Sequence, residues 1–349
     1  MKFPNSSFKR IQGLSLVELM VAITIGLIIM AAVSSLFVSS KQTYTTQDSL
    51  ARLQENGRLA MQFLIKDIRL AGFFGCLDGV DPGPTAQSDG SVASSNTKYL
   101  VNGGPTFTAN PFVRIEGIEN ASTSTTWLPS IAAQPANIKP GTDAITIRMA
   151  NVTAAANVAP GMLNGASPLI VNDTTPFTTG DIVVVSDCIT ADVIKITNIT
   201  GSPADTLERA ISQNVTTTLS KPYEPQARVH KLTLSQYFIQ TKPDGVPALF
   251  RDGVELVEGI ENLQILYGED TDVPPDGLPN IYRRASAVAD WSRVMSVRIG
   301  VLARTINSEG TDLDQADHDV DDDGIPELSA AGDRFRRRVF QAVVKLRNI

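Results

Sequence analysis

The chain has 349 residues, of which 42% are hydrophobic and 19% charged, a composition typical of folded rather than disordered protein. Its formal net charge is −7. A net acidic chain lacks the basic surface that phosphate binding requires, which argues against nucleic acid as a partner. By length alone, the chain is expected to form two to three folding units of ~150 residues each.

The first element is an apolar run from Leu14 to Val38. As a helix its 25 residues extend roughly 37 Å, enough to cross a membrane core of ~30 Å. The residues that precede it include three basic side chains, Lys2, Lys9 and Arg10, and no acidic one. This charge distribution predicts an amino terminus in the cytoplasm. One residue contradicts a simple apolar span. Glu18 places a carboxylate in it, at a cost of at least ~2.5 kcal/mol on insertion scales.

Two ordinary explanations of this run are incomplete. A cleaved signal peptide has an apolar region of ~7–15 residues, which is shorter than this one. A plain single-span anchor has the right length but gives no reason for Glu18.

A third interpretation accounts for the glutamate. The stretch Gly13-Leu14-Ser15-Leu16-Val17-Glu18-Leu19 resembles the prepilin cleavage motif of type IV pilins and type II secretion pseudopilins. The resemblance implies that residues 1–13 are a leader, that a prepilin peptidase cuts after Gly13, and that the new amino terminus at Leu14 is methylated. Leu14 departs from the phenylalanine usual at that position. Glu18 would pair with the terminal amine of a neighbouring subunit, which makes it an assembly residue because two costly groups then offset each other.

The helix is expected to continue beyond the membrane part (14–38) as an amphipathic part (39–70). The prediction rests on apolar residues that recur at mostly three- to four-residue steps, with no proline among them, and so form one stripe on a helix. They are Leu50, Leu53, Ala60, Leu64 and Ile68. Gly57 weakens the helix by up to ~1 kcal/mol, and a packing irregularity is favoured over a hinge there. The whole helix would extend about 85 Å and end at "AGFFGC", where Gly72 and Gly75 provide a stop.

The remainder, residues 71–349, is predicted to be a β-rich periplasmic head. Residues 77–140 are interpreted as long loops with a few short strands. Alternation and β-branched content predict antiparallel strands at 143–149, 181–188, 191–199, 227–240, 294–304 and 336–348. The segment 255–268 is expected to open as a helical turn and continue as a strand. The fold class is therefore α+β, with one long helix packed on a mainly antiparallel head.

Four segments extend the resemblance beyond the leader. They are "AGFFGC", "LVEGIENLQILYG", "VRIGVLART" and "FRRRVFQAVVKLRN", which look like the corresponding parts of PilW-type minor pilins. The type II secretion pseudopilin GspJ has a similar expected architecture. Between about residues 80 and 225 the resemblance is thin.

The two cysteines, Cys76 and Cys188, are expected to form a disulfide, since an even pair in an exported chain suits an oxidising compartment. Two unrelated buried thiols are the alternative. A zinc site would need more ligands than two cysteines and two scattered histidines supply.

An acidic run at 312–327 contains the oxygen ligands of a short calcium loop: Asp319, Asp321, Asp323 and Glu327. Ala330 stands where an EF-hand has its twelfth ligand, so an EF-hand is excluded, and a solvated acidic loop is the alternative. A second run at 269–277 is weaker because Pro274 and Pro275 interrupt it. The basic run at 334–338 is expected to pair with the acidic loop before it.

No catalytic triad, phosphate loop or C-x-x-C motif is present in the sequence, so an enzyme is disfavoured. The resemblance implies a minor pilin that helps to initiate type IV pilus assembly, near the pilus tip, in twitching motility and cell adhesion. Its partners would be the prepilin peptidase, other minor pilins, the major pilin and the inner-membrane assembly platform. It would span the inner membrane once and then join the pilus. The alternatives are a type II secretion minor pseudopilin and a membrane-anchored calcium-binding or adhesive domain.

Overall fold

The computed structural model describes residues 15–75, 85–86, 92–93, 97–101, 113–121, 137–201, 204–308 and 312–347. The chain separates into two compact units, Met1–Ala51 and Arg52–Ile349. One long helix, α1, spans Leu16–Leu70 and therefore contributes to both units. The predicted helix is confirmed to within two residues of its expected start.

Two glycines end α1 where the sequence places the stop. Gly72 and Gly75 have φ of 74° and 98°, a left-handed conformation that favours glycine over residues with a Cβ. The amide of Gly72 donates to the carbonyl of Arg148 at 2.9 Å. The turn that ends the helix is therefore hydrogen-bonded to the strand of the head that contains Arg148.

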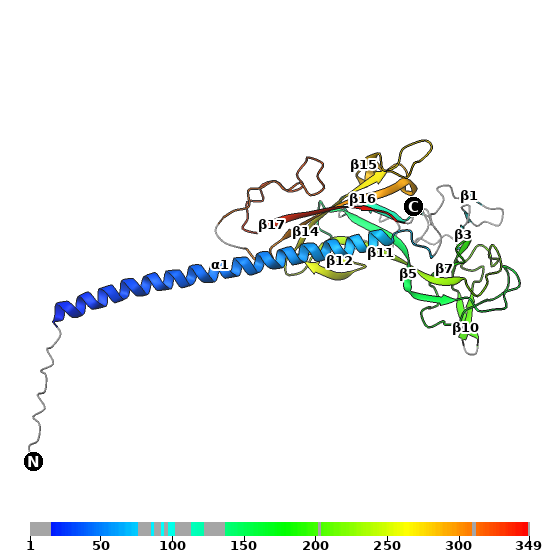
Figure 1. Cartoon of the computed structure of the whole chain (residues 1–349), viewed down its shortest axis with the longest axis horizontal. Coiled ribbons are helices and arrows are strands. Elements are labelled where there is room, and N and C mark those ends of the chain that lie inside the picture. The colour runs from blue at the N-terminus through cyan, green and yellow to red at the C-terminus, as the bar shows by residue number, and fades with distance from the viewer. Residues whose placement is uncertain are drawn as a thin grey trace, which may run out of the picture. The chain divides into compact units, whose positions relative to one another are not determined.

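Three sheets make up the described part of the head (Figure 1). The largest contains β1 (Thr85–Ala86), β2 (Val92–Ala93), β3 (Thr97–Tyr99), β4 (Ile115–Ile118), β5 (Ala144–Asn157), β7 (Ile182–Ser186), β8 (Ala191–Lys195), β11 (Arg228–Thr241), β12 (Pro247–Arg251) and β13 (Val254–Glu258). The second has the order β15 (Ile281–Arg283), β14 (Ile260–Glu269), β16 (Val294–Arg304) and β17 (Arg337–Lys345). The third has the order β6 (Leu169–Ile170), β10 (Ala204–Glu208) and β9 (Asn198–Gly201).

The strand pairs confirm the α+β prediction. Among the described strands, β3 pairs with β8 in parallel and every other pair is antiparallel. The predicted strands correspond to β5, β7, β8, β11, β16 and β17, and two 3-10 turns, Ala285–Ala287 and Trp291–Arg293, lead into β16. Much of the predicted loop region, including 102–112 and 122–136, lies outside the described residues.

The helical turn expected at the start of 255–268 is wrong. Residues Val254–Glu258 form strand β13, which pairs with β12 through a two-residue turn at Asp252-Gly253. Both turn residues have positive φ, 52° and 83°, as a tight hairpin requires. Pairing with β12 therefore overrides the local helical pattern, and β14 begins after a kink at Gly259, whose φ is 74°.

The core forms where the second half of α1 meets two sheets. Leu53, Ala60, Leu64 and Ile68 are at most 3% exposed and belong to one cluster with residues of β11, β14, β16 and β17. Four of the five predicted stripe residues are thus buried. Leu50 is the exception among them, at 36% exposed. It precedes the segment of α1 that forms part of the head unit.

A polar contact accompanies this apolar packing. The carboxylate of Asp67 is buried in the helix interface and accepts a hydrogen bond from the hydroxyl of Tyr237 at 2.7 Å. The guanidinium of Arg251 lies 3.2 Å from the same oxygen. Burial of a charged group is tolerated only with such partners, so the helix is held at one rotation about its axis.

Gly57 is explained by a close approach rather than by a hinge. It is buried in α1, and a Cβ built at this position would collide with the ring of Phe340 on β17. The helix and β17 can therefore approach at this level only because residue 57 has no side chain.

We expect Gly57→Ala to lower the free energy of unfolding by ~1–3 kcal/mol, because the added methyl overpacks the contact with Phe340. Helix propensity alone predicts the opposite sign, a gain of up to ~1 kcal/mol. Urea unfolding of the detergent-solubilised chain measures the difference. In a Phe340→Ala background the same change should stabilise, and stabilisation in the wild-type background would contradict the packing explanation.

Candidate functional site

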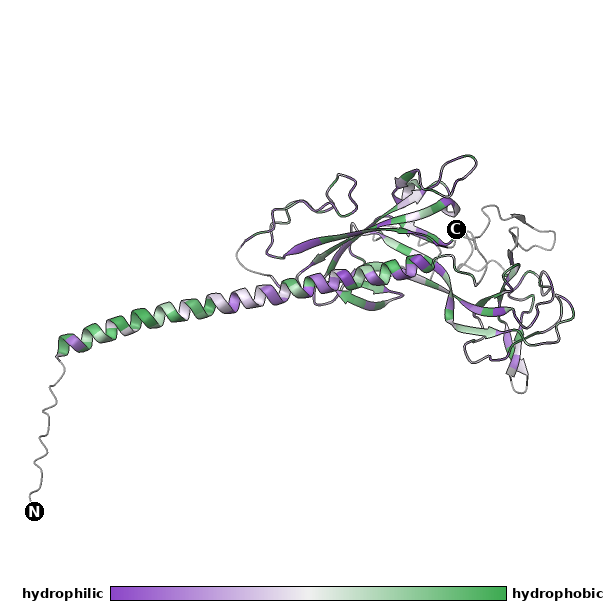
Figure 2. Cartoon of the chain, in the orientation of Figure 1, coloured by the Kyte–Doolittle hydropathy of each residue, from purple (hydrophilic) through white to green (hydrophobic). Residues whose placement is uncertain are grey.

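The first half of α1 contains the predicted assembly residue in an apolar surface. From Leu16 to Ser40, Glu18 is the only charged side chain. The first half of α1 is coloured mainly hydrophobic in Figure 2. Its large apolar side chains are exposed in the isolated chain, for example Leu16 at 74% and Met30 at 68%. By length and composition this helix can cross a membrane, with a mean hydropathy of 2.6 over 18 residues, none of them buried. Such a surface needs lipid or neighbouring helices to cover it.

The position of Glu18 in the helix does not by itself explain the residue. It lies in the first turn of α1, where the helix dipole favours an acid by ~0.3–1 kcal/mol. That gain is smaller than the cost of at least ~2.5 kcal/mol for a carboxylate in lipid. The difference favours a partner for Glu18. Gly13 and Leu14 lie outside the described residues, so cleavage and methylation remain predictions.

The acidic loop between β16 and β17 gathers three of the four predicted calcium ligands. One carboxylate oxygen each of Asp319, Asp321 and Glu327 lies within 4.8 Å of the others. The carboxylate of Asp319 accepts the backbone N–H groups of Asp322 at 2.7 Å and Gly324 at 2.9 Å. These backbone bonds shape the turn and bring the acids together without an ion.

Arg284, which the sequence reasoning missed, supplies positive charge to this loop. Its guanidinium lies 2.7 Å from Asp323, the fourth predicted ligand, and 3.6 Å from Asp321. It also lies 3.5 Å from Glu327. Arg284 follows β15 and is 39 residues away from Asp323, so no local pattern reveals the pairing. A calcium ion would share these acids with an arginine, and the site remains a prediction.

The basic run before β17 pairs with acidic residues, as expected. The guanidinium of Arg337 is almost fully buried and lies 2.9 Å from Asp314 and 2.7 Å from Asp333. Its third partner, Glu261 on β14 at 2.6 Å, is remote in sequence. Arg336 lies 3.5 Å from Asp312. The pairing is confirmed, and it ties the acidic loop to the sheet.

The second acidic run also forms a carboxylate cluster. Oxygens of Asp270, Asp272 and Asp276 lie within 4.8 Å of one another. The carboxylate of Asp270 accepts the amides of Asp272 at 3.0 Å and Gly277 at 2.7 Å. Arg293 lies 3.9 Å from Asp270. These bonds account for the cluster as the closure of a turn.

The predicted disulfide cannot be followed at both ends. Cys188 follows β7 at a φ of 71° and is not a free thiol. Cys76 lies outside the described residues, so its pairing with Cys188 remains a prediction.

Two family models match the chain at the places where these features lie. A model described as "Prokaryotic N-terminal methylation motif" matches residues 8–34, which include Glu18. A model described as "Type IV Pilus-assembly protein W" (PilW) matches residues 236–348. Together the two matches support a PilW-type minor pilin of type IV pili. No curated protein and no solved structure matches it.

The PilW match begins within β11 and ends beyond β17. It therefore contains all four strands of the β15–β14–β16–β17 sheet, which is one of the two sheets that pack on α1, together with both acidic runs and the arginines that pair with them. Residues 35–235 lie between the two matches. The similarity to the GspJ architecture remains an expectation.

The head also contains a buried ion pair that the sequence reasoning missed, in the part that precedes the PilW match. Arg148 on β5 is fully buried and contacts the carboxylate of Glu116 on β4. It also donates to the carbonyl of Val113 at 2.9 Å. A lone arginine in the predicted strand 143–149 was the available signal, because a buried charge requires a partner. The pair joins β4 to β5 and has a structural role.

We expect Asp321→Asn to stabilise the pilin at pH 7 in the absence of calcium. Burial, and then the nearby carboxylates of Glu327 and Asp323, raise the pKa of Asp321 to about 6. Above that pH the folded state carries a charge that is disfavoured relative to the unfolded state, by ~1–3 kcal/mol for a shift of this size. As the pH falls from 7 to 4, the Asp321 side chain of the folded wild-type protein becomes protonated and loses its charge. The stability advantage of Asp321→Asn over the wild type should therefore become smaller.

Thermal unfolding of the solubilised chain at both pH values measures this effect. Asp322→Asn is the matched control, since that side chain is 74% exposed and its φ of 62° suits asparagine. A variant at Asp321 that is destabilised equally at both pH values would contradict the charge explanation.

Calcium binding at the acidic loop is tested by calorimetric titration of the solubilised chain. A cation that relieves repulsion among Asp319, Asp321 and Glu327 should give a heat of binding at millimolar calcium or below. The heat should be lost in an Asp321→Ala, Asp323→Ala double variant. Equal heats in both proteins would remove the site.

Proposed function

We propose that this PilW-type pilin helps to initiate type IV pilus assembly and is incorporated at or near the tip of the pilus. There it supports twitching motility and surface attachment. The observation that carries the proposal is the lone carboxylate of Glu18 within the exposed apolar half of α1. The match to a pilus-assembly family supports it.

The chemistry of the helix suggests a route into the filament. Before assembly the pilin spans the inner membrane once, with a cytoplasmic amino terminus and a periplasmic head. The prepilin peptidase cuts after Gly13 and leaves a cationic amine at Leu14. In the filament the apolar half of α1 exchanges lipid for the helices of other minor pilins and the major pilin, while the amine and a Glu18 carboxylate neutralise each other. The inner-membrane platform would drive this transfer.

Two alternatives make different predictions. A type II secretion pseudopilin would use the same helix, and its deletion would reduce protein secretion while leaving pili intact. A membrane-anchored calcium-binding or adhesive domain would retain its function without Glu18. Counting pili and measuring secretion in the same deletion strain separates the first alternative from the proposal.

We expect Glu18→Ala to leave membrane insertion intact, because it removes a costly carboxylate, and to leave processing intact as well. Assembly should fail, since the amine of a neighbouring subunit would enter the apolar filament core unpaired, at ~3–5 kcal/mol for one broken side of a buried pair. Electron microscopy of a deletion strain that expresses the variant should show few or no pili.

Two further variants make this test specific. Gly13→Leu should also abolish pili, but with a heavier precursor that retains residues 1–13. Glu55→Ala, at an exposed glutamate of the second half of α1, should leave piliation unchanged. Normal piliation by processed Glu18→Ala protein would refute the pairing.

A further inference from the structure

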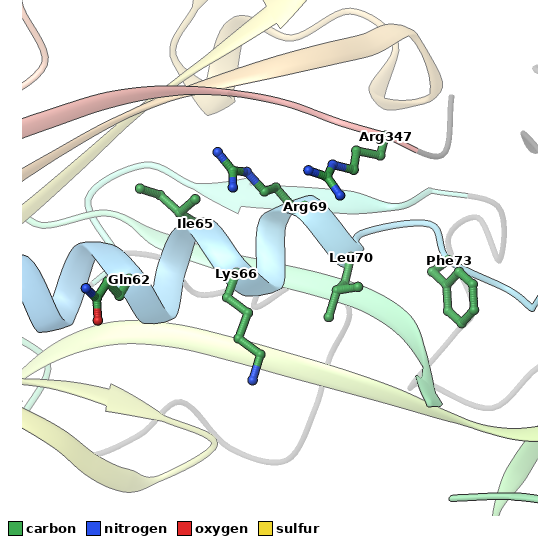
Figure 3. Close-up of a pocket in the computed structure, with 7 residues that line it drawn as sticks. All are labelled: Gln62, Ile65, Lys66, Arg69, Leu70, Phe73 and Arg347. Carbon is green, nitrogen blue, oxygen red and sulfur yellow. The ribbon is translucent and has the colours of Figure 1, made fainter. Parts of the chain in front are cut away.

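A groove of about 730 Å³ lies at the carboxyl end of α1, within the head unit (Figure 3). Its apolar lining consists of Ile65 and Leu70 from the helix and Phe73 just beyond it. Phe73 is fixed by its backbone, which donates to Leu70 at 3.0 Å and accepts from Ala150 at 2.6 Å. The groove is therefore built on ordered backbone rather than on a loose surface.

Three cations line the same groove: Lys66, Arg69 and Arg347. In the view of Figure 3 the side chains of Arg69 and Arg347 lie on one side of the helix and that of Lys66 extends on the other. Arg347 is positioned by its neighbour Leu346, which is 1% exposed and donates its amide to Met295 at 3.0 Å. Among the described residues, no carboxylate lines the groove and none forms an ion pair with these three cations.

Stabilisation of the helix explains only part of this arrangement. A cation in the last turn of a helix gains ~0.3–1 kcal/mol from the helix dipole, which can account for Arg69 but not for Lys66, one turn earlier. Arg347 comes from the opposite end of the chain and is brought there by β17. Three cations beside an apolar lining, with no acidic partner among the described residues, give the groove a positive charge that favours an anionic ligand.

We propose that this groove binds an acidic segment of another pilin subunit, with a large apolar side chain of that segment seated against Ile65, Leu70 and Phe73. The inference rests on the proposed role in pilus assembly. Charge complementarity selects the occupant, and the apolar lining favours a protein segment over a phosphate group. Lipid headgroups are a poor fit, because Lys66 lies 28 residues after Val38, roughly 42 Å along the helix from the end of the apolar run.

The test places a photo-crosslinking residue at Gln62, which lines the groove, in the full-length chain expressed in a piliated strain. Mass spectrometry should identify an acidic segment of another pilin as the crosslinked peptide. The yield should fall about tenfold or more in Lys66→Glu, Arg69→Glu protein. Reversing the acidic charges of the identified segment should restore it. A crosslinker at Gln54, exposed on α1 outside the groove, should not capture that segment.

Arg334→Glu, at an exposed arginine outside the groove, is the matched control and should leave the yield unchanged. An unchanged unfolding temperature of the double variant shows that it folds. Crosslinks to lipid, to a second copy of this chain or to a segment without acidic residues would overturn the proposal, as would a yield that survives the double charge reversal. Full piliation by that variant in a deletion strain would also overturn it, while leaving the proposed role in initiation intact.

Discussion

The burial of the second half of α1 in the head is the constraint on which the rest of the structure depends. Leu53, Ala60, Leu64 and Ile68 lose nearly all contact with water against strands of two sheets. Full burial of a large apolar side chain contributes ~1.5–3 kcal/mol, so this seam is a major part of the stability of the head. It also divides the helix by function. The second half is fixed by intramolecular packing, whereas the large apolar side chains of the first half are exposed in the isolated chain and need lipid or neighbouring helices to cover them.

Apolar burial does little to fix the rotation of the helix about its axis, and the polar contact of Asp67 fixes it. A helix could rotate slightly within an apolar seam at modest cost, but a buried carboxylate must keep its partners, Tyr237 and Arg251. Successive helical residues are about 100° apart, so fixing Asp67 inward also fixes Lys66 and Arg69 on the exposed side. The orientation of the groove at the end of the helix thus follows from a contact on the opposite face.

Sequence patterns predicted the secondary structure that depends only on residues close together in the chain. The helix, its stop at Gly72, and six strands follow from periodicity and turn residues within a few positions. Features that depend on residues far apart in the sequence could not be predicted. The need for a glycine at position 57 comes from the ring of Phe340, and the charge of the acidic loop is balanced by Arg284. The hairpin at Asp252-Gly253 is different, since its turn signal was present in the sequence and was outweighed by an apparent helical pattern.

The distribution of charge separates features that serve the fold from those left for a partner. Acidic runs on this chain are matched within the head, by Arg284 and Arg337, so their carboxylates do not by themselves require a metal or another protein. Glu18 and the cations Lys66, Arg69 and Arg347 have no such match among the described residues. An unmatched charge beside an apolar surface is costly in the free subunit, and that cost is relieved when a neighbour supplies the opposite charge. In the proposed filament, a helix that has an anion near its start and cations near its end would therefore favour assembly in one register over the alternatives.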